Sequence, residues 1–162
     1  MNAAQLRVFI VEPTLHFLEP EIPYSEDAVN LILGTAAQES HLQYIDQLTP
    51  GPGPAYGLFQ MEAPTHDDIW ANFLRFNKEL RAKVALCSLD VTFSIDGAPE
   101  MAGNLYYATA MVRCHYRRVK EAMPTTLEGY ARYWKAYYNT HLGKGTEDEF
   151  IANYKELIHG RV

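Results

Sequence analysis

Residues 25–40 read SEDAVNLILGTAAQES, and this stretch predicts a well-delimited helix. Ser25 is a favourable N-cap, and the carboxylates of Glu26 and Asp27 suit the positive end of the helix dipole. One face carries four residues at helical spacing, of which three are apolar and one is a carboxylate: Val29, Ile32, Ala36 and Glu39. The helix therefore ends on an acidic side chain that continues an apolar face.

Glu39 is the first candidate for chemistry on physical grounds. A carboxylate on an apolar face is costly unless it is paired, hydrogen-bonded or kept protonated. Burial raises the pKa of a carboxylic acid, and a general acid that works near neutral pH needs a raised pKa. The alternative is that Glu39 lies at a fraying helix end and points into water.

Outward from this helix the pattern stays helical, so we expect a mostly α fold with at most a minimal strand element. Proline and glycine alternate in residues 49–54 and predict a surface loop. A short strand is plausible at 91–93. The first expected helix is 3–11, followed at Pro13 by either a break or a new turn that continues to Phe17. A helix is expected at 65–86, with Thr65 as N-cap and Asp68 as a partial capping box, and another at 100–119. The last two expected helices are 126–138, with Thr126 as N-cap, and one that begins with a Thr146–Glu149 capping box.

Composition predicts one folded domain over residues 1–162. The chain is 48% hydrophobic and 21% charged, close to the average of globular proteins. No apolar run reaches the roughly 20 residues of a membrane-spanning helix, so we expect no membrane insertion. Residues 1–7 do not resemble a secretory signal. We therefore expect the protein to be made in a cytoplasm and to reach any cell wall by other means.

The net charge of −6 argues against a nucleic-acid partner, because phosphates favour a basic face. It is also unusual for a protein that acts on an anionic cell wall. One group of cations is predicted either to form a basic edge or to be an ordinary solvated helix face: Arg113, Arg117, Arg118 and Lys120.

The cysteines and histidines indicate no metal site or cofactor. Cys87 and Cys114 lie in apolar helical patterns and are predicted to be buried free thiols. The six histidines show neither HExxH nor paired i, i+4 spacing, so structural or surface roles are expected for them.

Four short motifs follow one another along the chain. Glu39-Ser40 comes first, YGLFQM at 56–61 follows with Pro64-Thr65 after it, then NLYYA at 104–108 and AYYN at 136–139. In this order they resemble the soluble lytic transglycosylase and goose-type lysozyme family. The signature of that family is Glu-Ser, Gly-Leu-Met-Gln with a Pro-Ala-Thr tail, Asn-Ile-x-x-Gly, and Ala-Tyr-Asn. The resemblance spans about residues 31–139.

The resemblance implies a single lysozyme-like helical domain that cleaves peptidoglycan glycan strands between N-acetylmuramic acid and N-acetylglucosamine. Glu39 is the implied catalytic acid. It would protonate the leaving oxygen and then act as a base, either on the muramoyl 6-hydroxyl to give a 1,6-anhydro product or on water. The substrate-binding residues implied by the motifs are Ser40, Gly57, Gln60, Met61, Tyr138 and Asn139.

Elementary chemistry fits these positions, although each also has an ordinary interpretation. Gly57 lets a backbone approach a sugar closely, or is a turn residue. Gln60 offers a donor and an acceptor to an N-acetyl group or to Glu39, or caps a helix end. The resemblance implies that Tyr138 reaches the acid, but the neighbouring Tyr137 leaves open which ring does so. Phe59 and the order Ala63-Pro64 depart from the family pattern.

Two rival functions follow from the same residues. One is a noncatalytic virion or wall-binding protein with this fold, which the acidic charge favours. The other is a chitinase-like glycan hydrolase in which a second carboxylate assists Glu39, with Glu62 and Asp46 nearest in sequence. The small size resembles bacteriophage lysis proteins, which implies release by a holin-type partner that damages the membrane.

Overall fold

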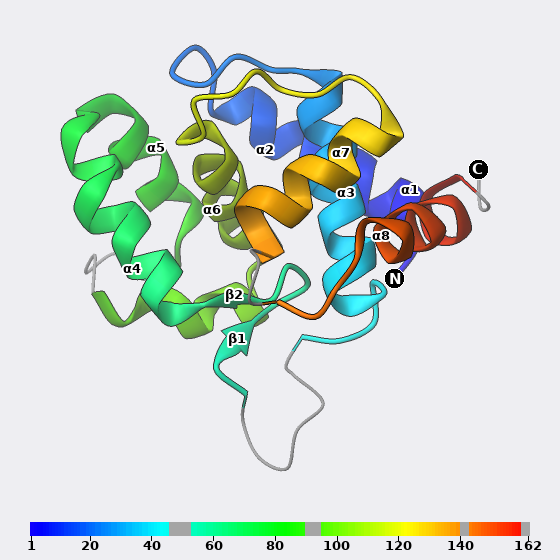
Figure 1. The fold of residues 1–162 in the computed structure, drawn as a ribbon. Helices are drawn as coiled ribbons and strands as arrows, with labels where there is room; N and C mark the ends of the chain where they lie inside the picture. Colours follow the sequence, from blue (N-terminus) through cyan, green and yellow to red (C-terminus); the bar gives the residue numbers. More distant parts are fainter. Residues whose placement is uncertain (46–52, 90–94, 140–142, 160–162) are drawn as a thin grey trace.

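Helix α3 (Glu26–Ser40) runs through the middle of the other helices in the computed structural model of the protein (Figure 1). The structure describes residues 1–45, 53–89, 95–139 and 143–159. Ser25 caps α3, since its hydroxyl accepts a hydrogen bond from the Ala28 amide at 3.3 Å. Helices α6, α7 and α8 all pack against α3. The predicted helix and its cap are therefore confirmed, and they are central to the packing.

The N-terminal segment is one continuous helical stretch. It comprises α1 (Ala3–Leu6), a π-helical turn (Arg7–Val11) and α2 (Glu12–Phe17). Pro13 lies in the first turn of α2, directly after the π turn. Of the two expectations for Pro13, a break is wrong and continuation to Phe17 is confirmed. A proline inside a helix disrupts the α-helical hydrogen-bond ladder, and here the π turn directly before α2 changes that ladder next to Pro13.

A two-residue antiparallel pair forms the only sheet of the described residues. Strand β1 (Ala55–Tyr56) pairs with β2 (Met61–Glu62) in the register Ala55 to Glu62 and Tyr56 to Met61. The expected minimal strand element therefore exists, but in the YGLFQM motif. The strand expected at 91–93 lies outside the described residues, as do residues 49–52 of the proline–glycine loop.

The prediction of a single helix over 65–86 is wrong. Helix α4 (Ala63–Asn72) begins before Thr65, with Glu62 at its N-cap and no side-chain cap. A 3-10 turn (Leu74–Phe76) separates it from α5 (Lys78–Cys87). The Asn77 side chain accepts a hydrogen bond from the Leu80 amide at 3.0 Å. Asparagine competes for backbone donors in this way, which favours the start of a new helix over continuation.

The helix predicted over 100–119 is shorter at both ends. Residues Ile95–Ala102 form 3-10 turns, and α6 (Leu105–Arg117) starts after Asn104, whose side chain caps the Tyr107 amide at 3.0 Å. The apolar spacing that predicted the helix does not distinguish α from 3-10 turns, and Asn104 marks the boundary.

The C-terminal helices agree with their predicted caps. Helix α7 (Leu127–Trp134) is capped by the Thr126 hydroxyl and continues as a π-helical turn (Lys135–Asn139). Helix α8 (Glu147–Tyr154) has the complete capping box of Thr146 and Glu149, and a π turn (Lys155–His159) follows it.

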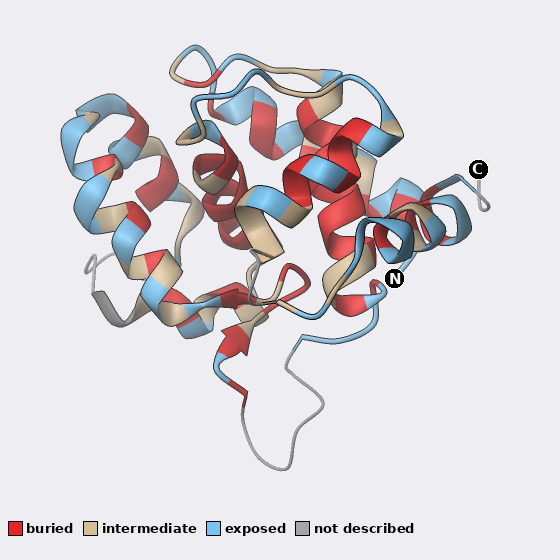
Figure 2. Ribbon diagram, in the orientation of Figure 1, coloured by how far each residue is buried: buried red, intermediate tan, exposed pale blue. Residues whose placement is uncertain are grey.

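The core surrounds α3 (Figure 2). Gly34 allows α8 to approach closely, since a Cβ atom there would lie 2.4 Å from Cζ of Phe150. The Thr35 hydroxyl shares a hydrogen bond of 2.7 Å with the Tyr116 hydroxyl inside the core. The mostly helical fold is thus organised by one buried helix.

Two further expectations concern the cysteines and the membrane. Cys114 is a buried free thiol as predicted, whereas Cys87 is free but only half-buried. Burial raises the pKa of the Cys87 thiol to about 11 and that of Cys114 to about 12, so both are inert as nucleophiles at neutral pH. Within the described ranges, no helix is both long and apolar enough to cross a membrane.

Replacing Gly34 by alanine should lower the free energy of unfolding by about 1–3 kcal/mol, because the added methyl group overlaps the Phe150 ring. Alanine is otherwise the better helix former by about 1 kcal/mol, so the sign tests the close approach of α8. Gly103→Ala, in the turn before α6, is the control for adding a methyl group without overlap, since a Cβ there meets no atom within 4 Å. Urea denaturation of the two variants measures both effects. A stabilised Gly34→Ala would contradict the packing.

Candidate functional site

Glu39 opens into a pocket of about 370 Å³ that we name the acid pocket. It lies where the end of α3, the β1–β2 pair, the first turn of α4, helix α6 and the π turn after α7 meet. Its lining is mostly polar, so it offers several hydrogen-bond donors and acceptors to a ligand. The lining residues are Glu39, Ala55, Gln60, Met61, Glu62, Thr65, His115, Tyr138, Asn139 and Gly143.

Glu39 is held by Trp134. The indole Nε1–H of Trp134 donates a hydrogen bond of 2.8 Å to Oε1 of Glu39. Burial raises the pKa of Glu39 to about 7, although the hydrogen bond from Trp134, which favours the charged form, opposes this shift. Glu39 therefore does not point into open water at a frayed helix end. Near pH 7 it exists in both protonation states, which suits a group that first donates and then accepts a proton.

Four of the six predicted binding residues lie in the acid pocket, and two do not. Gln60, Met61, Tyr138 and Asn139 line it. Ser40 is buried inside α3, where its hydroxyl donates to the Ala36 carbonyl at 3.0 Å. The side chain of Ser40 points away from that of Glu39, because the side chains of adjacent helical residues are rotated by about 100° about the helix axis.

Gly57 is a turn residue, which is one of the two interpretations of this position from the sequence. It has φ +75°, and a Cβ atom there would lie 2.2 Å from the Met101 carbonyl oxygen. The close approach that Gly57 allows is therefore to the backbone of the 3-10 segment Ile95–Ala102. The other interpretation, in which Gly57 lets the backbone approach a sugar, stays a prediction. Its carbonyl accepts hydrogen bonds from the backbone amide of Gln60 at 3.0 Å and from its side-chain Nε2 at 2.8 Å. This turn sets the position of Gln60 at the pocket.

Tyr138, and not Tyr137, is the ring at the acid pocket. Its hydroxyl donates a 2.7 Å hydrogen bond to the Phe59 carbonyl, which ties the π turn to the YGLFQM motif. Burial and the negative charge of the nearby Glu39 hold the pKa of Tyr138 well above its usual range. Tyr137 lies in a different hollow beside Glu121. The π turn, a feature often found at functional sites, thus brings Tyr138 and not Tyr137 to the pocket lining, with its hydroxyl bonded to Phe59; that a tyrosine contacts Glu39 stays a prediction.

His115 is a pocket residue that the sequence did not single out. Its Nε2–H donates to the Tyr137 carbonyl at 2.8 Å, and its Nδ1 accepts from the Arg118 guanidinium at 3.2 Å. Burial lowers the pKa of His115 to about 4, so the ring is neutral at neutral pH. Arg118 also pairs with Asp68 of α4. This chain of contacts fixes the ring against which the edge of Tyr138 packs, with 5.1 Å between ring centroids.

Trp134 was also missed, although a signal for it exists. It precedes Tyr138 by four residues, and residues with that spacing lie on the same side of a helix. No comparable signal links His115 to the motifs, because α6 comes beside the π turn only through the tertiary packing.

Glu62, the N-cap of α4, and Thr65 in its first turn also line the acid pocket. The next residue, His66, is fully buried and forms a 2.7 Å hydrogen bond with the Tyr107 hydroxyl. Trp70 donates to the same hydroxyl at 2.9 Å. These bonds attach α4 to α6. Glu62 is exposed and is a second carboxylate at the pocket, whereas Asp46 lies outside the described residues.

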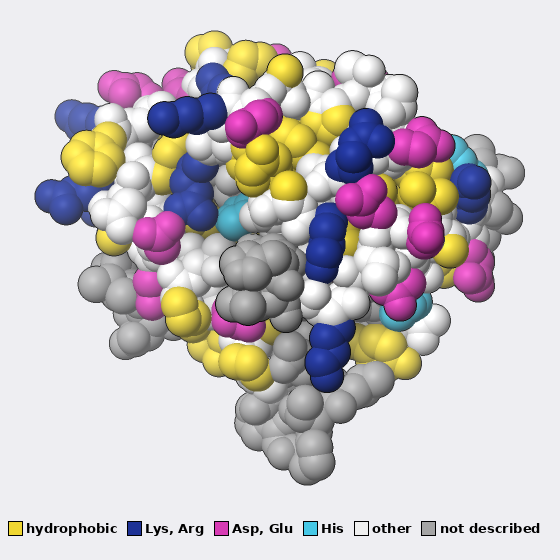
Figure 3. Space-filling model, viewed as in Figure 1, with side chains coloured by type: hydrophobic (Ala, Val, Ile, Leu, Met, Phe, Trp, Pro, Cys, Tyr) yellow, Lys and Arg dark blue, Asp and Glu magenta, His cyan; other side chains and the backbone are white. Residues whose placement is uncertain are grey.

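The four predicted cations do not form one basic edge. Arg113 is only 5% exposed and donates to the Pro23 carbonyl at 3.3 Å, and burial lowers its pKa to about 10. Arg117 and Lys120 are exposed and Arg118 is half-buried. On the face shown in Figure 3, the Lys and Arg side chains alternate with Asp and Glu, so this face carries mixed charge.

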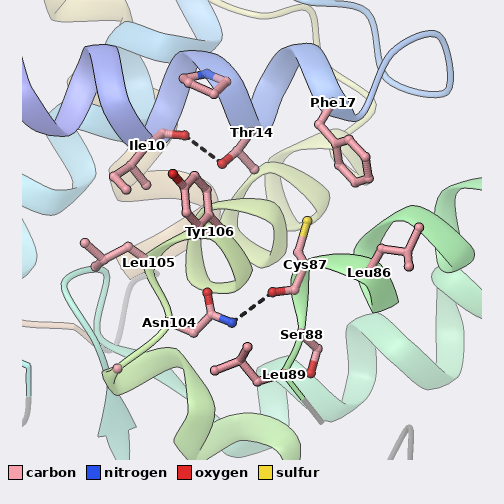
Figure 4. Close-up of a pocket in the computed structure, with 12 residues that line it drawn as sticks. Ile10, Thr14, Phe17, Leu86, Cys87, Ser88, Leu89, Asn104, Leu105 and Tyr106 are labelled. Atoms are coloured by element: carbon pink, nitrogen blue, oxygen red, sulfur yellow. Dashed lines mark hydrogen bonds between the residues drawn. The ribbon is translucent and has the colours of Figure 1, made fainter. Parts of the chain in front are cut away.

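An apolar groove of about 660 Å³ lies elsewhere, between α2, the end of α5 and the start of α6 (Figure 4). Exposed apolar side chains such as Phe17, Leu86 and Leu89 line it, and its lining contains no carboxylate or histidine. Its Thr14 hydroxyl and Asn104 amide donate to the Ile10 and Cys87 carbonyls at 2.6 and 2.8 Å. The groove therefore offers no carboxylate or imidazole for acid–base chemistry.

Within the described part of the chain, no group of three or more His, Cys, Asp or Glu residues is arranged to hold a metal ion.

Comparisons of the chain with protein-family models, with curated proteins and with solved structures find no match. The resemblance of the motifs therefore enters the functional argument only as a hypothesis beside the geometry of the acid pocket.

Replacing Glu39 by glutamine should stabilise the fold at high pH. The folded-state pKa of about 7 exceeds the ordinary value of 4.5, so the folded state binds its proton more tightly than the unfolded state. The contribution of this group to stability is fully present below pH 4.5 and is lost as the pH rises through 7. The unfolding free energy of Glu39→Gln relative to wild type should rise across this window by up to roughly 3 kcal/mol.

Chemical denaturation at pH 4.5 and pH 8 measures this difference. Gln60→Asn is the control, because it changes a side chain of the same pocket without removing an ionisable group, and asparagine tolerates the positive φ of 47° at this position. A stability difference for Glu39→Gln that is the same at both pH values would show that the pKa of Glu39 is not raised.

Replacing Trp134 by phenylalanine should raise the pKa of Glu39 above about 7, since the lost hydrogen bond favours the charged carboxylate. NMR titration of the Glu39 carboxyl carbon, with Glu39→Gln used for assignment, measures the shift. A lowered pKa would mean that water replaces the indole and that burial does not dominate.

Proposed function

We propose that the protein cleaves the β-1,4 bond between N-acetylmuramic acid and N-acetylglucosamine in peptidoglycan, with Glu39 as general acid and then base. The observation that carries this proposal is the half-buried Glu39, whose pKa is about 7, at the wall of a polar pocket. A group that is partly protonated at neutral pH can protonate the glycosidic oxygen as the bond to the anomeric carbon breaks.

The pocket supplies the groups that a sugar requires. Gln60, Thr65 and Asn139 present amide and hydroxyl groups along the lining, and Met61 gives an apolar surface. Asn139 accepts a hydrogen bond from Lys135 at 2.7 Å, which orients its amide. These neutral polar groups suit the hydroxyl and N-acetyl substituents of the substrate.

The second half of the reaction needs an acceptor for the oxocarbenium-like sugar. After donating its proton, the Glu39 carboxylate takes one from the muramoyl 6-hydroxyl, whose oxygen closes a 1,6-anhydro ring, or from water, which gives a reducing end. Trp134 stabilises this carboxylate through its N–H donor. Neither step requires a cofactor.

We also propose a role in bacteriophage lysis, with a holin-type partner giving access to the wall.

A second candidate is a glycan hydrolase that uses two carboxylates. Its support is Glu62, whose exposed carboxylate lines the same acid pocket as Glu39. In that reaction Glu62 would activate water or stabilise the sugar cation while Glu39 donates the proton. The two candidates differ in product, since a 1,6-anhydro end is one water lighter than a reducing end.

Replacing Glu39 by glutamine should reduce release of soluble fragments from purified cell-wall sacculi by at least roughly 100-fold, because glutamine cannot donate the proton. Glu79→Gln, the same change on the exposed surface of α5, is the matched control and should retain activity. Mass spectrometry of the fragments identifies the product. An active Glu39→Gln, or a wild-type protein that releases nothing, would refute the proposal.

A further inference from the structure

A second hollow adjoins the acid pocket and shares one wall with it. It has a volume of about 290 Å³ and is lined by His115, Arg118, Val119, Lys120, Glu121 and Tyr137; we name it the side hollow. His115 belongs to both linings. Hydrogen bonds to Tyr137 and Arg118 hold the His115 ring at the boundary between the two cavities.

The chemistry of the two cavities differs. Gln60, Thr65 and Asn139 give the acid pocket neutral hydrogen-bonding side chains. The lining of the side hollow contains no amide side chain and no serine or threonine, and its polar groups are chiefly charged. Sugar hydroxyls fit the first set of groups, whereas a ligand with formal charges fits the second.

The charges of the side hollow are of both signs. Arg118 is partly offset by its ion pair with Asp68, and it also donates to His115. Lys120 is exposed and belongs to none of the ion pairs found among the described residues. The Glu121 carboxylate lies beside Tyr137 and raises the pKa of its hydroxyl. The side hollow thus offers a free ammonium group, a guanidinium group and one carboxylate around an aromatic ring.

We propose that the side hollow binds the peptide carried by the muramoyl sugar while the glycosidic bond lies in the acid pocket. This inference rests on the proposed function and names the substrate class more closely, as glycan that still carries its peptides. Such a peptide has free carboxylates, which Lys120 and Arg118 attract, and peptides with a free amine also match Glu121. Local cations are needed for this contact because the whole chain carries a net charge of −6.

The test compares two substrates. Intact sacculi carry their peptides, and sacculi treated with an amidase lack them. Lys120→Glu should lower kcat/KM on intact sacculi by roughly fivefold to tenfold, because it replaces attraction by repulsion at one exposed charge, and should leave cleavage of the peptide-free glycan unchanged. Lys78→Glu at the start of α5 makes the same charge change outside both cavities and should alter neither rate. Arg118 is not a clean probe because it also holds His115.

A binding experiment separates this proposal from the proposed function. In the Glu39→Gln background, calorimetry with a peptide-bearing disaccharide and with the bare disaccharide should show a weaker Kd on Lys120→Glu for the first ligand only. An equal loss for both ligands would assign the side hollow to a sugar and overturn the proposal. No effect of Lys120→Glu on either ligand would also overturn it, while cleavage by the wild type would leave the proposed function standing. Failure of the wild type to cleave either sacculus would overturn both.

Discussion

The contact on which the site depends joins the end of α3 to the end of α7. There the Trp134 indole donates to a Glu39 carboxyl group that burial keeps close to half protonated at neutral pH. A carboxyl group in this position is costly to ionise, and one hydrogen bond only partly offsets that cost. The carboxyl group is held there because α3 is buried along most of its length and cannot rotate to carry Glu39 into water.

The rest of the fold keeps these two helix ends in place. Gly34 lets α8 pack directly on α3, and the Phe150 ring lies tilted against Trp134 with 5.4 Å between ring centroids. Helix α4 is attached to α6 through His66 and Tyr107 near the start of α6 and through Asp68 and Arg118 just after its end. These contacts join separate helices and hold together an acid pocket whose lining comes from several segments of the chain.

The π turn after α7 places two adjacent tyrosines in the linings of two different cavities. Continuing α7 as a π turn brings Tyr138 to the Phe59 carbonyl and leaves Tyr137 beside Glu121. Two adjacent tyrosines thereby line two different cavities, with His115 between them. If the side hollow binds the peptide of the substrate, this turn separates recognition of the peptide from chemistry on the sugar.

The sequence by itself determined the features that depend on local interactions. The caps at Ser25, Thr126 and Thr146 start helices because their side chains bond to nearby amides, and the apolar face of residues 26–40 required burial of that helix. It also brought Glu39, Gln60 and Tyr138 forward as site candidates. The division of 63–87 at Asn77 rests on a local cap of the same kind, which the continuous apolar spacing obscured. Only the tertiary structure decided the contact of Gly57 with Met101 and the roles of Trp134 and His115. These depend on which segments pack together, and periodicity along one segment does not encode the partners of a side chain across the core.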